Sequence, residues 1–139
     1  MKIVITSHGD LCEGILTSYK MIAGDTSKFI AVKLDENGIS DFSFRLTKVL
    51  DEQISNNKPV IVLSDIMGGT PYNETLRYML AHPNKVFLFA GLNLPMLIQA
   101  GTSLEESIIP DLLNSILEAG QTSVLLAPTT IDNDENIDF

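Results

Sequence analysis

The chain has 139 residues, of which 45% are hydrophobic, and carries a formal net charge of −9. This length and apolar content favour one folded domain and exclude an intrinsically disordered chain. The negative charge argues against nucleic-acid binding, which needs a basic surface, and the single cysteine, Cys12, excludes an intrachain disulfide.

Five short apolar segments predict β-strands. They are almost continuously apolar rather than alternating, which is typical of strands that are buried on both faces of a sheet. In chain order they comprise residues 3–5, 29–34, 60–63, 86–90 and 123–127.

Segments with the apolar periodicity of a helix lie between these strands. One is predicted to begin with Thr70 as its N-cap and Pro71 at its first position. A capping box from Ser103 to Glu106 predicts a further helical region, which Pro110 should kink or divide. The apolar faces of the first three helices are formed by Leu11, Ile15, Tyr19 and Ile22, by Phe42, Leu46, Val49 and Leu50, and by Tyr72, Leu76, Met79 and Leu80.

The alternation of strands and helices predicts a single α/β domain with a mainly parallel sheet, in the strand order 2-1-3-4, and helices on both faces. We expect this domain to cover residues 1–128. Residues 129–139 are polar and acidic, which predicts a solvated tail. The uncharged segment 86–104 is interrupted by Gly91, Pro95 and Gly101, so we do not expect it to span a membrane. We therefore expect a soluble, intracellular protein.

Two polar residues follow neighbouring strands of this predicted sheet. Ligands of such folds bind at the carboxyl ends of the strands, where the strand order reverses. In the order 2-1-3-4, His8 after the first strand and Asp65 after the third would face each other. A carboxylate that accepts one ring N–H orients an imidazole and stabilises positive charge on it, so the pair predicts a nucleophilic histidine.

The segment after Asp65 has the features of a binding site for a phosphoryl group. Gly68 and Gly69 allow the backbone to approach a ligand closely, and the helix that starts at Thr70-Pro71 directs free N–H groups outward. His82 lies near the end of a helix and is predicted to be structural. The two histidines lack the spacing of zinc ligands, and we expect neither a metal nor another cofactor.

The main alternative from the residues alone is a response-regulator receiver domain, in which an aspartate after the third strand is phosphorylated. Asp65 stands at that position. A receiver also needs an acidic pair after the first strand and a lysine after the fifth. This chain has Ser7-His8-Gly9 and Ala127-Pro128 there, which disfavours the receiver.

Three segments, IVITSHGDLCEG, VLSDIMGGTPYN and AGLNLPM, resemble the signature segments of the mannose-family IIA components of the bacterial phosphoenolpyruvate-dependent sugar phosphotransferase system. The resemblance extends from the first strand to about Pro128. It implies that His8 is the phosphorylated histidine, that Asp65 is its partner carboxylate and that Thr70 hydrogen-bonds the phosphoryl oxygens beside Gly68 and Gly69.

The resemblance also implies a function as a phosphotransferase component. In this family the histidine receives phosphate from the histidine-containing phosphocarrier protein and passes it to a IIB component, which serves the membrane subunits IIC and IID. It implies a cytoplasmic location, including peripheral association with that transporter. The alternative is the phosphotransfer subunit of a dihydroxyacetone-kinase system, which uses a similar domain.

The last apolar segment, residues 124–127, predicts a homodimer. An apolar strand at a sheet edge promotes association unless it is paired or covered, and exchange between two protomers would cover it. The resemblance implies the same exchange of a C-terminal, antiparallel edge strand. The alternative is a monomer in which this strand pairs with its own sheet.

Overall fold

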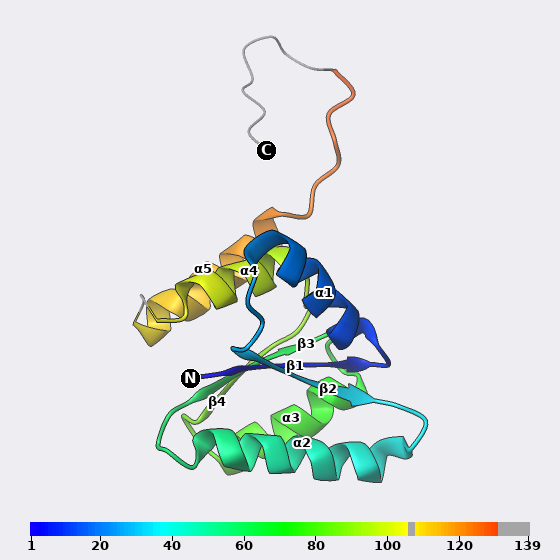
Figure 1. Cartoon of the computed structure of the whole chain (residues 1–139), viewed down its shortest axis with the longest axis vertical. Coiled ribbons are helices and arrows are strands. Elements are labelled where there is room, and N and C mark those ends of the chain that lie inside the picture. The colour runs from blue at the N-terminus through cyan, green and yellow to red at the C-terminus, as the bar shows by residue number, and fades with distance from the viewer. Residues whose placement is uncertain (106–107, 131–139) are drawn as a thin grey trace.

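The computed structural model describes residues 1–105 and 108–130 and contains one parallel β-sheet in the order β2-β1-β3-β4. The predicted strand order is confirmed. The strands are β1 (Ile3–His8), β2 (Phe29–Leu34), β3 (Val60–Ser64) and β4 (Val86–Phe89), so that β2 and β4 form the two edges (Figure 1).

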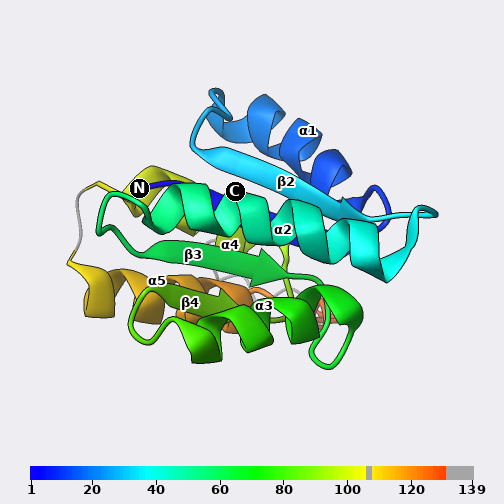
Figure 2. The same ribbon diagram turned by 90° about the horizontal axis from the view of Figure 1, so that it is seen from below.

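Helices cover both faces of the sheet, as the sequence predicts. One face carries α2 (Gly38–Ile54) and α3 (Thr70–Ala81), and the other carries α1 (Leu11–Ala23), α4 (Leu94–Ser103) and α5 (Ile109–Thr122) (Figures 1 and 2). The single α/β domain is therefore a three-layer structure.

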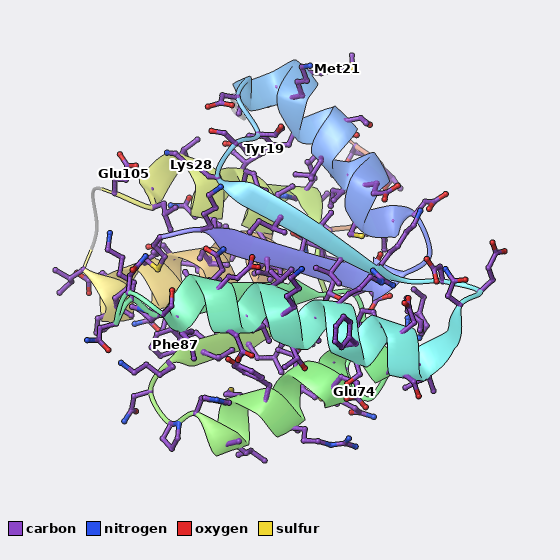
Figure 3. The ribbon with its side chains drawn as sticks, turned by 60° about the horizontal axis from the view of Figure 1, so that its bottom comes forward. Tyr19, Met21, Lys28, Glu74, Phe87 and Glu105 are labelled. Atoms are coloured by element: carbon purple, nitrogen blue, oxygen red, sulfur yellow. The ribbon has the colours of Figure 1, made fainter. Side chains whose placement is uncertain are left out.

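Alternating strand residues build two apolar cores, because successive side chains of a strand point to opposite faces. In β1, Ile3 and Ile5 pack toward α1, α4 and α5, whereas Val4 packs toward α2 and α3. The first core includes an edge-to-face contact between the rings of Tyr19 and Phe29, whose centroids lie 4.8 Å apart. Tyr19 lies near Lys28, which precedes β2 (Figure 3).

Two helix boundaries differ from the sequence prediction. The residue before α3 is Gly69, in an extended conformation, and Thr70 is the first helical residue rather than the N-cap. Pro110 lies in the first turn of α5, where its missing N–H is tolerated, so it begins a helix instead of kinking one.

The helix α4 was not predicted. Its N-cap is Asn93, whose side-chain oxygen accepts a hydrogen bond from the Met96 N–H, and Pro95 lies in its first turn. Ser103 is the last residue of α4 and therefore does not open the next helix. Glu106, the other half of the predicted capping box, lies outside the described residues.

The predicted C-terminal strand pairs with no strand of its own protomer within the described residues. Residues 124–128 have no regular secondary structure and project from the end of α5, away from the sheet (Figure 1). Val124, Leu125 and Leu126 are 77%, 73% and 93% exposed. The acidic residues of the predicted tail, which begin at Asp132, lie outside the described residues.

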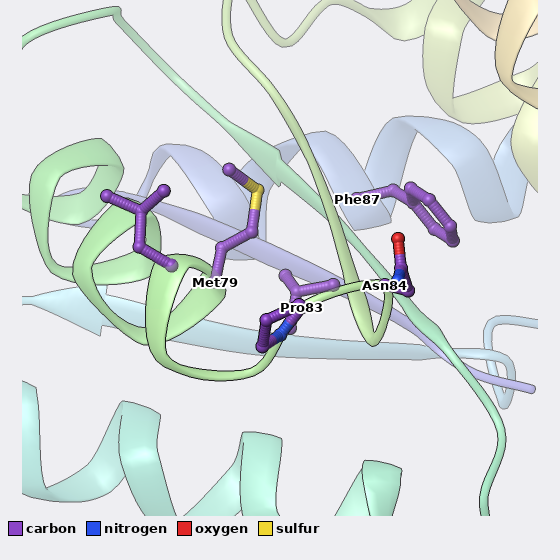
Figure 4. A pocket seen from close by; sticks show the side chains of 6 residues that line it. Met79, Pro83, Asn84 and Phe87 are labelled. Atoms are coloured by element: carbon purple, nitrogen blue, oxygen red, sulfur yellow. The ribbon is translucent and has the colours of Figure 1, made fainter.

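An apolar groove of about 310 Å³ lies beside the edge strand β4, next to the end of α3 (Figure 4). The residues that line the groove are Met79, Leu80, Pro83, Asn84, Val86 and Phe87.

None of the helices in residues 1–105 and 108–130 has both the length and the apolar character needed to cross a membrane.

Candidate functional site

His8 is the last residue of β1, and the turn that follows it is fixed by hydrogen bonds on both sides. The Gly9 N–H donates to the Leu34 carbonyl of β2, at 2.7 Å. The buried Ser7 hydroxyl donates to the Gly9 carbonyl at 2.8 Å and accepts the Cys12 N–H of α1 at 2.9 Å. Ser7 thus pairs with one N–H of the first turn of α1 from within the strand, while the neighbouring His8 side chain remains 50% exposed.

His8 and Asp65 lie together, as the strand order predicts. The ring Nδ1 of His8 lies 2.7 Å from Oδ2 of Asp65, and the His8 backbone N–H donates to the same oxygen at 2.8 Å. The other carboxylate oxygen accepts the Ile66 N–H at 2.8 Å. These contacts hold the carboxylate and the imidazole in one fixed relative orientation.

The surroundings of Asp65 favour its ionised form. Burial, which leaves 10% of the side chain exposed, opposes ionisation. The hydrogen bonds from the backbone and ring of His8 and from the Ile66 N–H outweigh that effect and lower the pKa of the Asp65 carboxyl. An ionised carboxylate only accepts hydrogen bonds, so Nδ1 of His8 carries a proton and the Nε2 lone pair of the neutral ring is free.

The loop between β3 and α3 approaches the imidazole closely. A Cβ atom at Gly69 would lie 2.6 Å from Cε1 of His8 and 3.3 Å from its Nε2, so only glycine leaves room for the ring. Gly68 has a φ of +84°, a left-handed conformation that glycine adopts without strain. Thr70 follows directly as the first residue of α3, which places a helix N-terminus behind the loop.

Apolar side chains lie in the segments next to this exposed histidine. Leu11 at the start of α1 and Ile66 and Met67 in the β3–α3 loop are exposed, whereas Tyr72 is half-buried. Three of these four residues therefore form an apolar rim at the carboxyl edge of the sheet. Lys33 pairs with Asp10 at 2.7 Å and with Glu13 at 3.4 Å on the β2 side of the same edge.

His82 and Cys12, the other candidate reactive side chains, lie in surroundings that serve the fold rather than a reaction. The Nδ1 of His82 lies 2.8 Å from the Tyr78 carbonyl, and its ring stacks on that of Tyr78 at 4.0 Å. Cys12 is fully buried, and burial raises the pKa of its thiol. The described residues contain no group of three or more side chains suited to hold a metal ion.

The arrangement is suited to nucleophilic group transfer. It offers a half-exposed imidazole with a free Nε2, a carboxylate that holds the opposite nitrogen, and a glycine loop in front of a helix N-terminus. Sequence reasoning missed Ser7 as the residue that orders the turn. The sequence signal that could have found it is a small hydroxyl residue, Ser7, five positions before Cys12, whose N–H lies in the first turn of the expected helix.

Comparison with known proteins connects this site with sugar transport. A family profile described as EIIA-man, PTS system fructose IIA component, matches residues 2–117. The chain is 32% identical over 124 residues to a PTS system fructose-specific EIIA component from Bacillus subtilis, covering 88% of this chain and 84% of that protein. A match to the Escherichia coli PTS system mannose-specific EIIAB component, at 28% identity, covers 70% of this chain but only 30% of that protein.

Solved structures agree with these sequence matches. The mannose/sorbose specific IIA subunit of the phosphotransferase system from Enterococcus faecalis superposes with a TM-score of 0.78 and 35% identity, and the match covers 98% of each chain. The segments that build the site, from His8 to the Gly68–Gly69 loop, lie within the residues that the family profile matches.

Proposed function

The chain belongs to the EIIA-man family of IIA components of the sugar phosphotransferase system, and we propose that it acts there as a phosphohistidine carrier with His8 as the phosphorylated residue. The observation that carries this proposal is the 2.7 Å contact between Nδ1 of His8 and Asp65, on a histidine whose side chain is half exposed. Asp65 is the orienting carboxylate.

The transfer step follows from this geometry. The Nε2 lone pair attacks the phosphorus of a phosphohistidine on the donor, the new N–P bond forms, and the N–P bond to the donor imidazole breaks. The donor imidazole leaves with the electron pair of that bond. The proton on Nδ1 of His8 stays in its hydrogen bond to Asp65, and that carboxylate stabilises the positive charge that develops on the ring.

The phosphoryl oxygens are held by Gly68, Gly69 and Thr70. The glycine loop lies against the ring at the Cε1–Nε2 edge, and the N-terminus of α3 favours a negative charge there. The Thr70 hydroxyl contributes a further hydrogen bond. The reverse transfer uses the same groups.

The partners are the histidine-containing phosphocarrier protein as donor and a IIB component as acceptor, which links the chain to the membrane subunits IIC and IID. Each meets the apolar rim of Leu11, Ile66 and Met67 in turn, and this transient exchange takes place in the cytoplasm, including at the transporter. The exposure of these three side chains beside His8 supports that docking.

The test is phosphorylation in vitro with phosphoenolpyruvate, enzyme I and the phosphocarrier protein. Intact-mass measurement should find one added phosphate, labile in acid and stable in base, that is absent from His8→Ala. Asp65→Asn should fold normally and accept phosphate much more slowly.

A phosphate that persists in His8→Ala, or one carried by Asp65, would contradict the proposal and favour a receiver-like domain. Transfer to the acceptor protein of a dihydroxyacetone-kinase system, but not to a IIB component, would favour that alternative.

We also propose a homodimer in which residues 124–127 of each protomer pair with the edge strand β4 of the other. The chain leaves α5 beside the carboxyl end of β4, because Val124 lines one cavity together with Ala90 and Gly91. A strand that starts there runs antiparallel to β4. Exchange preserves this pairing between protomers and covers both an apolar segment and an open sheet edge.

A further inference from the structure

The side chain of Asn73, in the first turn of α3, is hydrogen-bonded to the glycine loop and has no role in the proposed transfer so far. Nδ2 of Asn73 donates a hydrogen bond to the Gly68 carbonyl at 3.0 Å, and its backbone N–H donates to the Gly69 carbonyl at 2.8 Å. Asn73 itself is exposed and makes no contact with the core that would explain these bonds. Its amide therefore acts on the loop rather than on the packing of α3.

The Gly68 carbonyl is the acceptor that a longer helix would use. In an α-helix each N–H donates to the carbonyl four residues earlier, so Gly68 would accept the N–H of Tyr72. That bond is absent from the described residues, and neither the Tyr72 nor the Thr70 N–H donates to another protein group there. Two backbone donors thus remain unpaired directly behind the loop that contacts His8.

We propose that Asn73 is a positioning residue for phosphoryl transfer. By bonding the Gly68 carbonyl, its side chain holds that oxygen in an orientation that the Tyr72 N–H does not reach, so this N–H stays available to a phosphoryl oxygen. The same bond holds the Gly68–Gly69 turn against the His8 ring. The inference rests on the proposed function, because it assigns the donors that bind the phosphoryl group on Nε2.

Three substitutions separate this role from a contribution to stability. Asn73→Ala releases the Gly68 carbonyl, which the Tyr72 N–H can then bind. Asn73→Asp also removes the side-chain donor, yet a carboxylate in the first turn of a helix is favourable for helix stability. Arg77→Ala, one turn further along α3 and 78% exposed at its side chain, is the matched control.

The experiment measures single-turnover phosphorylation of each variant by the phosphocarrier protein, together with amide shifts of Tyr72 in ¹H–¹⁵N spectra before and after phosphorylation. Both Asn73 variants should accept phosphate about 10²-fold more slowly, which is the lower end of the loss when one hydrogen-bond donor to a reacting oxyanion is removed. The Tyr72 amide should shift on phosphorylation of the wild type and of Arg77→Ala, but not of Asn73→Ala. Thermal unfolding checks that the variants remain folded.

Rates within twofold of the control, or an unchanged Tyr72 amide in the phosphorylated wild type, would overturn the role of Asn73. Either result leaves His8 as the carrier. Failure of the wild type to gain a phosphate on His8 would instead contradict the proposed function itself, so the two failures are distinguishable.

Discussion

The two histidines of the chain differ in what their rings contact. Each has its Nδ1 within hydrogen-bond distance of an oxygen, at 2.7 Å for His8 and 2.8 Å for His82. The oxygen beside His8 belongs to a carboxylate that can balance a developing positive charge, whereas His82 faces a backbone carbonyl and stacks on Tyr78. The partner and the exposure of the ring, rather than the residue type, make His8 the candidate nucleophile.

Gly69→Ala should slow phosphorylation of His8 while the fold is retained. The backbone at Gly69, with φ −77° and ψ 165°, suits any residue, so the added methyl group acts only through contact. It would lie 2.6 Å from Cε1 of His8 and 3.1 Å from Cγ2 of Ile66, and the ring must turn away from Asp65 to avoid it. Phosphorylation rates and thermal unfolding measure the two effects.

Gly14→Ala is the control, because a Cβ there meets no atom within 4 Å and alanine is favoured in a helix by about 0.5–1 kcal/mol. It should transfer phosphate at the wild-type rate. Equal rates in Gly69→Ala and Gly14→Ala would show that the loop does not need to approach the ring.

The carboxyl of Asp65 should make folding stability depend on pH in the acid range. Its folded-state pKa is lowered, so its ionised form stabilises the folded state above the unfolded pKa of about 3.9. That stabilisation is lost as the pH falls through the lower, folded pKa. Urea unfolding between about pH 5 and pH 2 should show the gap between wild type and Asp65→Asn shrinking toward low pH. A gap that is constant or grows over this range would contradict the assignment.

The sequence predicted the contact between His8 and Asp65 but not the residues that order the site. His8 and Asp65 could be paired because the carboxyl ends of adjacent parallel strands meet at one edge. Ser7 and Asn73 act through hydrogen bonds from a side chain to a backbone group five residues away, and such bonds follow neither the helical nor the strand period. Only the folded backbone reveals their geometry.

At the scale of elements, the four strands of the sheet were predicted to within a few residues because each is a short, nearly continuous apolar run, buried in β1 and β3 and partly buried in the edge strands β2 and β4. The helix α4 was missed because its segment is apolar on almost every side, which hides the helical period. Asn93 followed by Pro95 is a helix start signal that would have found it. The kink predicted at Pro110 was wrong because proline is also typical of the first turn of a helix, which is where it lies in α5.

Asn93→Ala should destabilise the packing of α4 against α5. The side chain accepts the Met96 N–H at 3.1 Å as an N-cap and donates to the Gly120 carbonyl at 3.2 Å. Loss of a cap costs about 1 kcal/mol and loss of one further hydrogen bond about 0.5–1.5 kcal/mol, so we expect a loss of about 1.5–2.5 kcal/mol in the free energy of unfolding. Chemical denaturation measures it.

Asn56→Ala, in the exposed turn after α2, should stay within about 0.5 kcal/mol of the wild type. If both asparagine variants lose the same stability, the connection that Asn93 makes between α4 and α5 is not important for the fold.

At the scale of the whole molecule, one apolar segment and the outer edges of β2 and β4 remain unpaired in the described protomer. Val124, Leu125 and Leu126 extend from α5 into solvent, while β4 pairs with β3 alone. Burial of each such side chain contributes about 1.5–3 kcal/mol, so leaving all three exposed forgoes a large part of the stability of a small domain. The apolar groove along β4 enlarges the same uncovered surface (Figure 4).

Two truncations test whether a second copy covers this surface. Removal of residues 131–139 should leave the dimer intact at micromolar concentration, because the proposed exchange uses residues 124–127 alone. Removal of residues 123–139 deletes the strand itself, opens the edge of β4 and should yield monomers that aggregate more readily. Light scattering measures the mass of each form. A monomeric full-length chain, or an undisturbed dimer that lacks residues 123–139, would contradict the exchange, since no other described segment offers an apolar strand to β4.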